Sequence, residues 1–168
     1  SVTSLQANAD ISSTNAKVVG IYTTNGIFAE NHGKISLTGD NSSAMYSTKD
    51  TTTGISTLLK NESTGNIEVG KNGSAMYVVG NNAENKGAIK IGEGSVAMRT
   101  EGGTLYNYAT GTIDSTGTKA QGMSQSTGGN ITNDGTITLT GDQSIGIHSE
   151  NITLAVRTVT NTGTITVG

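Results

Sequence analysis

One phrase recurs along the chain at intervals of 22 to 32 residues, and this repeat limits how the chain can fold more than any other feature. Each copy contains an isoleucine, and the isoleucines are Ile11, Ile35, Ile67, Ile89, Ile113, Ile137 and Ile165. A second apolar anchor follows nine or ten residues later, directly after a Gly or Ala, and these anchors are Ile21, Met45, Met76, Met98, Met123 and Ile147. Repeats of this length stack on one another, so the chain is predicted to be a solenoid.

Within each copy, apolar and polar residues alternate, as in Ile35/Leu37, Ile67/Val69 and Ile89/Ile91. Alternation with a period of two is typical of a strand that buries one face. A third apolar position lies further along each repeat, at Ala29, Leu59, Ala83, Leu105, Ile131 and Val159. Each repeat therefore contains three short strands separated by turns, which is one coil of a parallel β-helix.

We predict an all-β fold, a right-handed parallel β-helix of about seven rungs of 22–32 residues, in which residues 1–168 form a single segment. Right-handedness is the usual hand of parallel crossovers. Left-handed helices built on hexapeptides have shorter coils. A two-sheet Greek-key sandwich is the competing fold, but it would not repeat the same residue types at the same offset in every unit.

Composition excludes several classes of protein. Gly, Thr, Ser and Asn make up 85 of 168 residues, and these poor helix formers exclude a helical bundle. The absence of Cys excludes a disulfide scaffold and a thiolate metal site. A net charge of −3 gives no electrostatic basis for binding nucleic acid. Without an apolar run of the length a membrane helix needs, this segment is not expected to insert into a membrane.

The residue after each second anchor is expected to point outward. This column contains Tyr22, Tyr46, Tyr77, Arg99, Ser124 and His148. Three successive rungs thus carry a tyrosine at one offset, and the rings should be neighbours that stack in offset fashion. Such a row is either a platform for a sugar or a partner protein, or a stack that only stabilises the rod.

The interval from Ile35 to Ile67 is the longest, at 32 residues. Its extra chain falls at about Ser47–Thr57, is polar, and follows Tyr46. We predict a loop that leaves the rod beside the tyrosine column, where Lys49 and Asp50 join the tyrosines and Arg99 in a candidate binding surface. Rigid scaffolds often present binding residues on such loops.

Two further columns are expected to be structural. An asparagine column, Asn31, Asn85, Asn133 and Asn161, with Asn61 and Asn107 shifted by two residues, should hydrogen-bond between rungs. The glycine that follows in each repeat, at Gly33, Gly65, Gly87, Gly111, Gly135 and Gly163, is expected to adopt a backbone angle that other residues resist.

No catalytic, metal or cofactor site is predicted. The acidic residues are scattered, no GxSxG or HExxH motif occurs, and His148 has no second histidine nearby in the pattern. Two alternatives stay open. A polysaccharide-degrading β-helix enzyme would need a cleft with clustered carboxylates or a calcium site. An ice-binding β-helix would need a flat Thr-x-Thr array, which Thr136/Thr138/Thr140 and Thr164/Thr166 provide on two rungs only.

The repeats NHGKISLTGDNSSAMY (31–46), GNIEVGKNGSAMY (65–77), NKGAIKIGEGSVAMR (85–99) and NDGTITLTGDQSIGIH (133–148) resemble the passenger regions of large type V autotransporter adhesins, particularly fusobacterial ones. The resemblance implies an extracellular, non-enzymatic β-helix stalk, which is secreted through an outer-membrane barrel and anchored by it at the cell surface. It also implies attachment or co-aggregation through a protein or glycan on a host or bacterial cell. Since the chain shows no barrel pattern and no signal peptide, we expect it to be a fragment of a longer passenger.

Overall fold

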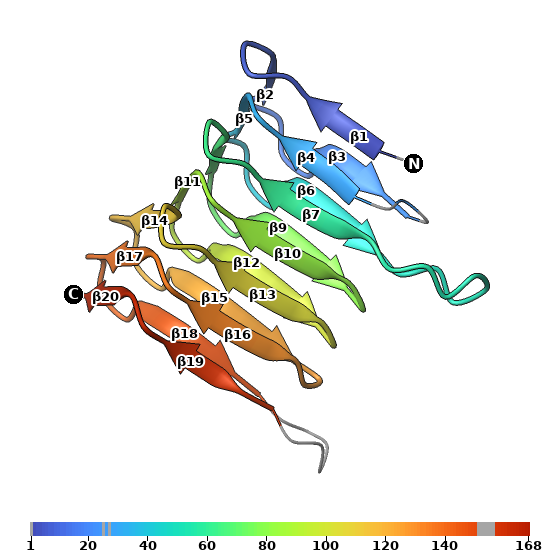
Figure 1. Ribbon diagram of the computed structural model, residues 1–168. Helices are drawn as coiled ribbons and strands as arrows, with labels where there is room; N and C mark the ends of the chain where they lie inside the picture. Colours follow the sequence, from blue (N-terminus) through green and yellow to red (C-terminus); the bar gives the residue numbers. More distant parts are fainter. Residues whose placement is uncertain (1, 25, 27, 151–156) are drawn as a thin grey trace.

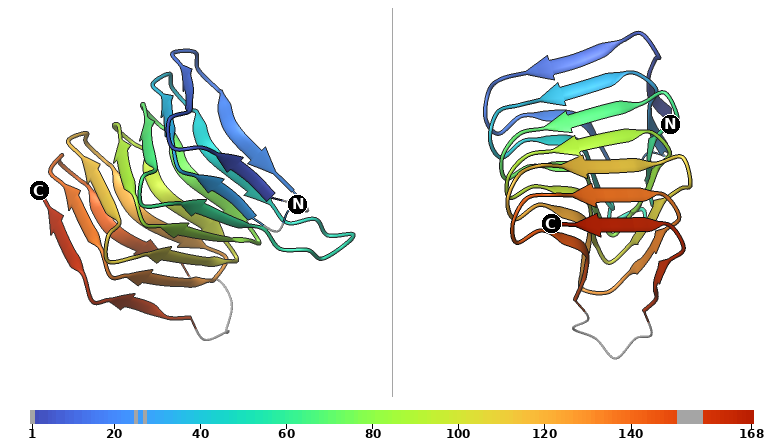
Figure 2. Two further views of the ribbon diagram at one scale, coloured as in Figure 1. Left: turned by 45° about the horizontal axis from the view of Figure 1, so that its top comes forward. Right: turned by 90° about the vertical axis from the view of Figure 1, so that its left-hand side faces the viewer.

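Twenty short β-strands build the fold in the computed structural model, which describes residues 2–24, 26, 28–150 and 157–168. Turns link the strands into a solenoid of about seven coils, and each complete coil contributes one strand to each of three sheets (Figures 1 and 2). Neighbouring strands within each sheet are parallel. The predicted all-β parallel β-helix is therefore confirmed. This part of the chain contains no helix that is long and apolar enough to cross a membrane.

We name the sheets A, B and C in the order in which the chain visits them. Sheet A consists of β1 (Val2–Leu5), β4 (Phe28–Asn31), β7 (Leu58–Asn61), β10 (Asn82–Asn85), β13 (Thr104–Asn107), β16 (Asn130–Asn133) and β19 (Val159–Asn161). Sheet B consists of β2 (Asp10–Ser13), β5 (Lys34–Leu37), β8 (Asn66–Val69), β11 (Ala88–Ile91), β14 (Thr112–Ser115), β17 (Thr136–Leu139) and β20 (Thr164–Val167). Sheet C consists of β3 (Val19–Thr23), β6 (Ser43–Thr48), β9 (Ser74–Val79), β12 (Val96–Glu101), β15 (Gln121–Ser126) and β18 (Ile145–Ser149).

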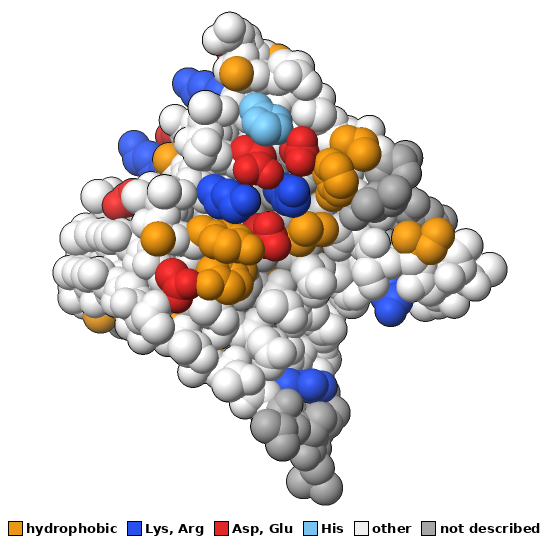
Figure 3. Space-filling model, viewed as in Figure 1, with side chains coloured by type: hydrophobic (Ala, Val, Ile, Leu, Met, Phe, Trp, Pro, Cys, Tyr) orange, Lys and Arg blue, Asp and Glu red, His pale blue; other side chains and the backbone are white. Residues whose placement is uncertain are grey.

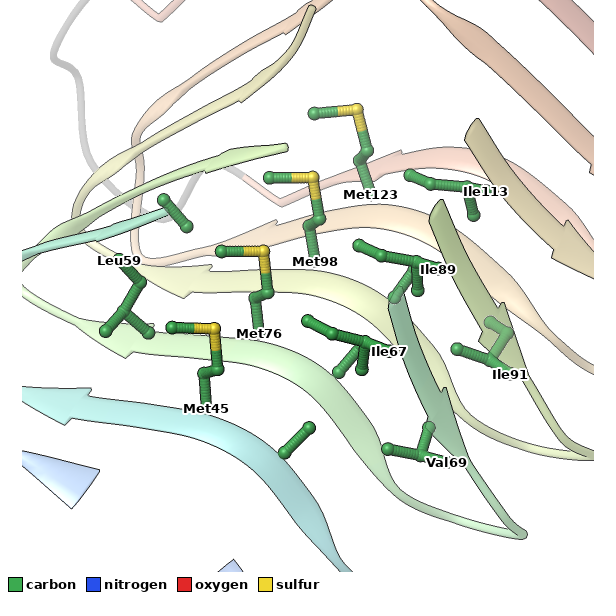
Figure 4. Close-up of a cluster of buried hydrophobic side chains, with 14 of the residues drawn as sticks. Met45, Leu59, Ile67, Val69, Met76, Ile89, Ile91, Met98, Ile113 and Met123 are labelled. Atoms are coloured by element: carbon green, nitrogen blue, oxygen red, sulfur yellow. The ribbon is translucent and has the colours of Figure 1, made fainter. Parts of the chain in front are cut away.

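The core is a set of straight columns of identical or similar apolar side chains. The anchoring isoleucines pair in register from rung to rung, as Ile89 does with Ile67 and Ile113. The four methionines form a second column along sheet C (Figure 4). Fully or almost fully buried side chains in these two columns are Ile35, Ile67, Ile89, Ile113, Ile137, Met45, Met76, Met98 and Met123. Each such side chain contributes roughly 1.5–3 kcal/mol by leaving water.

A continuous ladder of asparagine side chains lines the end of sheet A. Each Nδ2 donates to the Oδ1 of the next rung over 2.8–2.9 Å. In the described residues the ladder consists of Asn31, Asn61, Asn85, Asn107, Asn133 and Asn161. The predicted two-residue shift of Asn61 and Asn107 is wrong, because both pair in register with Asn85. Their extra residues lie in the turn that follows, since the next glycine comes four positions later rather than two.

The glycines after this ladder are required by close approach between rungs, and the predicted unusual backbone angle is wrong for them. None of these described glycines has a positive φ. A Cβ built on Gly87 would lie 2.3 Å from the carbonyl oxygen of Gly65, and one on Gly135 would lie 2.3 Å from that of Gly111. Any larger residue would push neighbouring coils apart.

Left-handed backbone occurs instead in other turns, and most regularly in the turn between sheets B and C. One residue of this turn has a positive φ on six successive coils of the described chain: Lys17 (59°), Asn41 (59°), Asn72 (53°), Gly94 (67°), Lys119 (57°) and Gln143 (59°). Glycine tolerates this conformation because it lacks a Cβ, and asparagine because its short polar side chain can hydrogen-bond locally, whereas lysine and glutamine are strained by it. Three coils therefore carry a strained residue at this turn.

Replacing Lys119 by glycine is expected to stabilise the rod by about 0.5–1 kcal/mol, because the relief of strain exceeds the entropic cost of glycine. Lys119 is exposed, and its backbone N–H donates to the carbonyl oxygen of Asp142 at 2.8 Å, a bond that needs no side chain. The urea midpoint should rise for Lys119→Gly. Asn41→Gly is the matched control at the same turn position, and a rise of equal size there would contradict the greater strain assigned to lysine.

Candidate binding surface

The predicted outward column of sheet C forms as expected. Tyr22 pairs with Tyr46, Tyr46 with Tyr77, and Tyr77 with Arg99 in the parallel register. The column continues through Ser124 to His148. One flank of the rod therefore carries three tyrosines on successive rungs, followed by a cation, a small hydroxyl residue and an imidazole. We call Tyr22, Tyr46 and Tyr77 the tyrosine ladder.

The rings of the tyrosine ladder are neighbours, but they do not lie parallel. The centroids of Tyr22 and Tyr46 are 5.3 Å apart with an interplanar angle of 33°, and those of Tyr46 and Tyr77 are 5.2 Å apart at 83°. The predicted offset stack is thus replaced by tilted and edge-to-face contacts, which the ring quadrupole also favours. Tyr22 is the most accessible ring, with 55% of the residue exposed.

Hydrogen bonds fix the two ends of the tyrosine ladder. The Tyr22 hydroxyl lies 2.9 Å from Thr48 Oγ1, and the Tyr77 hydroxyl donates to Glu101 Oε1 at 2.5 Å. Partial burial and this bond to Glu101 raise the pKa of Tyr77 to about 12. The phenol therefore stays protonated and oriented throughout the physiological pH range.

Arg99 closes the tyrosine ladder on the next rung. Its guanidinium carbon lies 4.7 Å from the centroid of the Tyr77 ring, in a cation–π contact. Its Nη2 also contacts Glu101 Oε1 at 3.3 Å, so Glu101 receives both the Tyr77 hydroxyl and the Arg99 cation. Tyr77, Arg99 and Glu101 thus hold one another in place on this face.

The predicted loop leaves the rod after β6, which ends at Thr48, and returns at Leu58, the first residue of β7 (Figure 1). The insertion begins at Lys49 rather than at Ser47. The aliphatic stem of Lys49 packs over Gly80, where a Cβ would lie 3.1 Å from Lys49 Cβ. The loop therefore emerges from the edge of sheet C to which the Tyr22 hydroxyl points.

Asp50 organises this loop from within. Its carboxylate accepts the backbone N–H groups of Thr52 (3.0 Å) and Thr53 (3.2 Å) and the Thr53 hydroxyl (2.9 Å). These contacts form a turn that presents Ile55, which is 45% exposed. Asp50 therefore shapes the loop, while Lys49 anchors its base.

Beyond Arg99 the same face is hollowed. Ser124 and Ser126 on β15 are too small to continue the row of large side chains, and a depression of about 250 Å³ results. Arg99 borders it on one side and His148 with Glu150 on the other. We call this depression the notch. Sequence reasoning placed Ser124 and His148 in the column, but it did not foresee a concavity.

Sheet A carries a second polar face that sequence reasoning missed (Figure 3). Lys60 lies 3.6 Å from both Glu30 and Glu62. Tyr106 and Tyr108 stack at 4.0 Å with an angle of 25°. The sequence contains a signal for this face, because the residues that follow the third apolar position alternate in charge on three successive rungs, at Glu30, Lys60 and Glu84. Ion pairs and ring contacts within the face satisfy these groups, as in the contact of Lys86 Nζ with the Tyr108 ring at 5.0 Å.

The outward column of sheet B contains the carboxylates and threonines that matter for the two alternative functions, a polysaccharide-degrading enzyme and an ice-binding protein. Glu68, Lys90 and Asp114 lie in register with Thr138 and Thr166, so charged side chains occupy the three rungs that precede the threonine rows. Lys90 separates the two carboxyl groups along the column. Burial raises the pKa of Asp114. Among the described residues, no group of three His, Cys, Asp or Glu side chains is arranged to hold a metal ion.

Comparison with known proteins found no match: no protein-family model, no curated protein and no solved structure is significantly similar to this chain.

Proposed function

We propose that this chain is a structural and adhesive segment of a bacterial surface autotransporter passenger, which mediates attachment or co-aggregation outside the cell. Two features support this function. The repeats resemble those of such passengers, and a rigid parallel solenoid can hold a binding face away from a cell surface. The observation that carries it is the tyrosine ladder, three aromatic rings fixed in register on one flank. Tyrosines held in this way lose little entropy on binding and are typical of binding hot spots.

The ligand in this proposal is a protein or glycan on a host or bacterial cell. The loop at Lys49–Asp50 stands beside the ladder and enlarges the surface available for contact. Its internal hydrogen bonds order it before binding, which reduces the entropic cost of association.

The adhesion test uses fluorescent beads that carry the purified chain, incubated with cultured epithelial cells and with bacterial cells. The Tyr46→Ala/Tyr77→Ala variant should bind at least tenfold fewer beads, because hot-spot tyrosines each contribute on the order of 2 kcal/mol. The matched control is Tyr106→Ala/Tyr108→Ala, which removes two rings from sheet A. Wild-type beads that bind no better than uncoated beads, or equal losses in both double variants, would refute the proposal.

A further inference from the structure

The notch is a one-rung gap in a row of large side chains. Its middle rung, β15, contributes Gln121, Ser124 and Ser126, while Arg99 and His148 stand on the rungs before and after it. Arg99 and His148 are two rungs apart, which is about 9–10 Å at the usual strand spacing. The depression between them has a volume of about 250 Å³, which is enough for one pyranose ring.

The side chains around the notch suit a neutral ligand that offers both donors and acceptors. Arg99 donates, Glu150 accepts, and Gln121 and Ser124 do both. The polar side chains around the notch already have partners: Arg99 contacts Glu101 at 3.3 Å, His148 Nε2 lies 3.5 Å from Glu150, and His148 Nδ1 lies 3.4 Å from the Ser124 hydroxyl. A charged ligand would have to compete with one of these pairs, whereas adjacent hydroxyl groups can share them.

The notch also lies in line with the tyrosine ladder. Ser124 occupies the same column as Tyr77, and Arg99 between them stacks on the Tyr77 ring. A ligand that fills the notch and extends along the rod therefore passes over Arg99 onto aromatic rings. Rungs repeat every 4.8 Å or so, and an extended β-linked glycan advances by a similar distance per sugar.

We propose that the notch binds one residue of a neutral, linear, β-linked glycan, and that the following residues lie along the tyrosine ladder. This inference rests on the proposed adhesive function and names its ligand class. Planar polar side chains would pair with hydroxyl groups in the notch, and the tyrosines would contact the apolar faces of the sugar rings.

Isothermal titration of the whole chain with cellohexaose, laminarihexaose and N-acetylchitohexaose tests this inference, and an acidic heparin hexasaccharide serves as the comparison. At least one neutral hexasaccharide should bind. Ser124→Tyr, which fills the notch, should weaken that binding at least tenfold, and Gln121→Ala should weaken it without adding bulk. Ser36→Tyr is the matched control, because it places the same ring on an outward position of sheet B.

The outcomes separate the inference from the adhesive function. The inference fails if no neutral hexasaccharide binds at millimolar concentration, if only the acidic probe binds, or if both notch variants bind as wild type does. Ser124→Tyr beads that still adhere to cells, when Tyr46→Ala/Tyr77→Ala beads do not, would leave the adhesive function standing and overturn the glycan assignment. Melting temperatures identify any variant that has lost its fold.

Discussion

Replacing Ile113 by aspartate should destabilise the rod by about 5 kcal/mol, because it puts a carboxylate among stacked apolar side chains. Ile113 has no exposed surface and packs in register between Ile89 and Ile137. A domain of ordinary stability has only 5–15 kcal/mol in total. Urea denaturation followed by circular dichroism should show either a greatly lowered midpoint or an unfolded chain at 25 °C.

Two comparisons separate the destabilising effect of the buried charge at this position from the effect of the lost side-chain volume. Ile113→Val removes one methylene and should cost only about 1 kcal/mol. Burial raises the folded-state pKa of the new carboxyl, so the folded variant binds a proton more tightly than the unfolded chain. Its stability deficit relative to wild type should therefore shrink as the pH falls from 8 towards 4. An aspartate variant with the wild-type midpoint would contradict the stacking of these rungs.

Much of the core could be predicted from the sequence because a parallel stack converts sequence offsets directly into neighbours in space. Ile67, Ile89 and Ile113 share an offset in their repeats, and the structure places them in one column. The same reasoning placed Tyr22, Tyr46 and Tyr77 in one line and located the inserted loop. These predictions needed only the strand register, which the repeat itself provides.

The errors arose where turn length and contacts between coils decide the outcome. The sequence predicts that Asn61 and Asn107 are shifted by two residues from the other asparagines of the column. The strand register keeps both residues in the ladder and lets the turn absorb two residues. Likewise, glycine is required at position 87 because the carbonyl oxygen of Gly65, on the preceding rung, leaves no room for a Cβ. A local sequence pattern does not reveal this contact between coils.

For the candidate site, the sequence predicted where the side chains lie but not which groups they bond to. Offsets put Tyr77 and Arg99 on one outward column. Glu101 contacts both of them. These contacts depend on the directions of the side chains within β12, which a repeat pattern does not specify. Asp50 was expected on the binding surface because it lies on the loop, yet its carboxylate is engaged in holding that loop.

The asparagine ladder is the second place where one substitution should have a large effect. The donor of each side chain points to the following coil and the acceptor to the preceding one, so the amide dipoles are aligned along the rod. Asn107 is fully buried within this chain of bonds. Its Oδ1 accepts from Asn85 at 2.9 Å, and its Nδ2 donates to Asn133 at 2.8 Å.

Asn107→Ala should cost about 3 kcal/mol, because it deprives both Asn85 and Asn133 of a partner in a buried site where each unmet group costs 1–3 kcal/mol. Asn107→Leu restores most of the volume and should remain destabilised by about 2 kcal/mol, since the hydrogen bonds are still missing. A leucine fits this column, because Leu5 already occupies it beside Asn31.

Position in the ladder provides the control. Asn161 is exposed and accepts one ladder bond, from Asn133, so Asn161→Ala should cost less than about 1 kcal/mol. Urea midpoints of the three variants measure these costs, and a double-mutant cycle between Asn85→Ala and Asn107→Ala should give a coupling energy of about 1 kcal/mol or more. If Asn107→Leu proves as stable as wild type, or if the two alanine substitutions are additive, then the asparagines fill space between coils and their hydrogen bonds contribute nothing to holding the coils together.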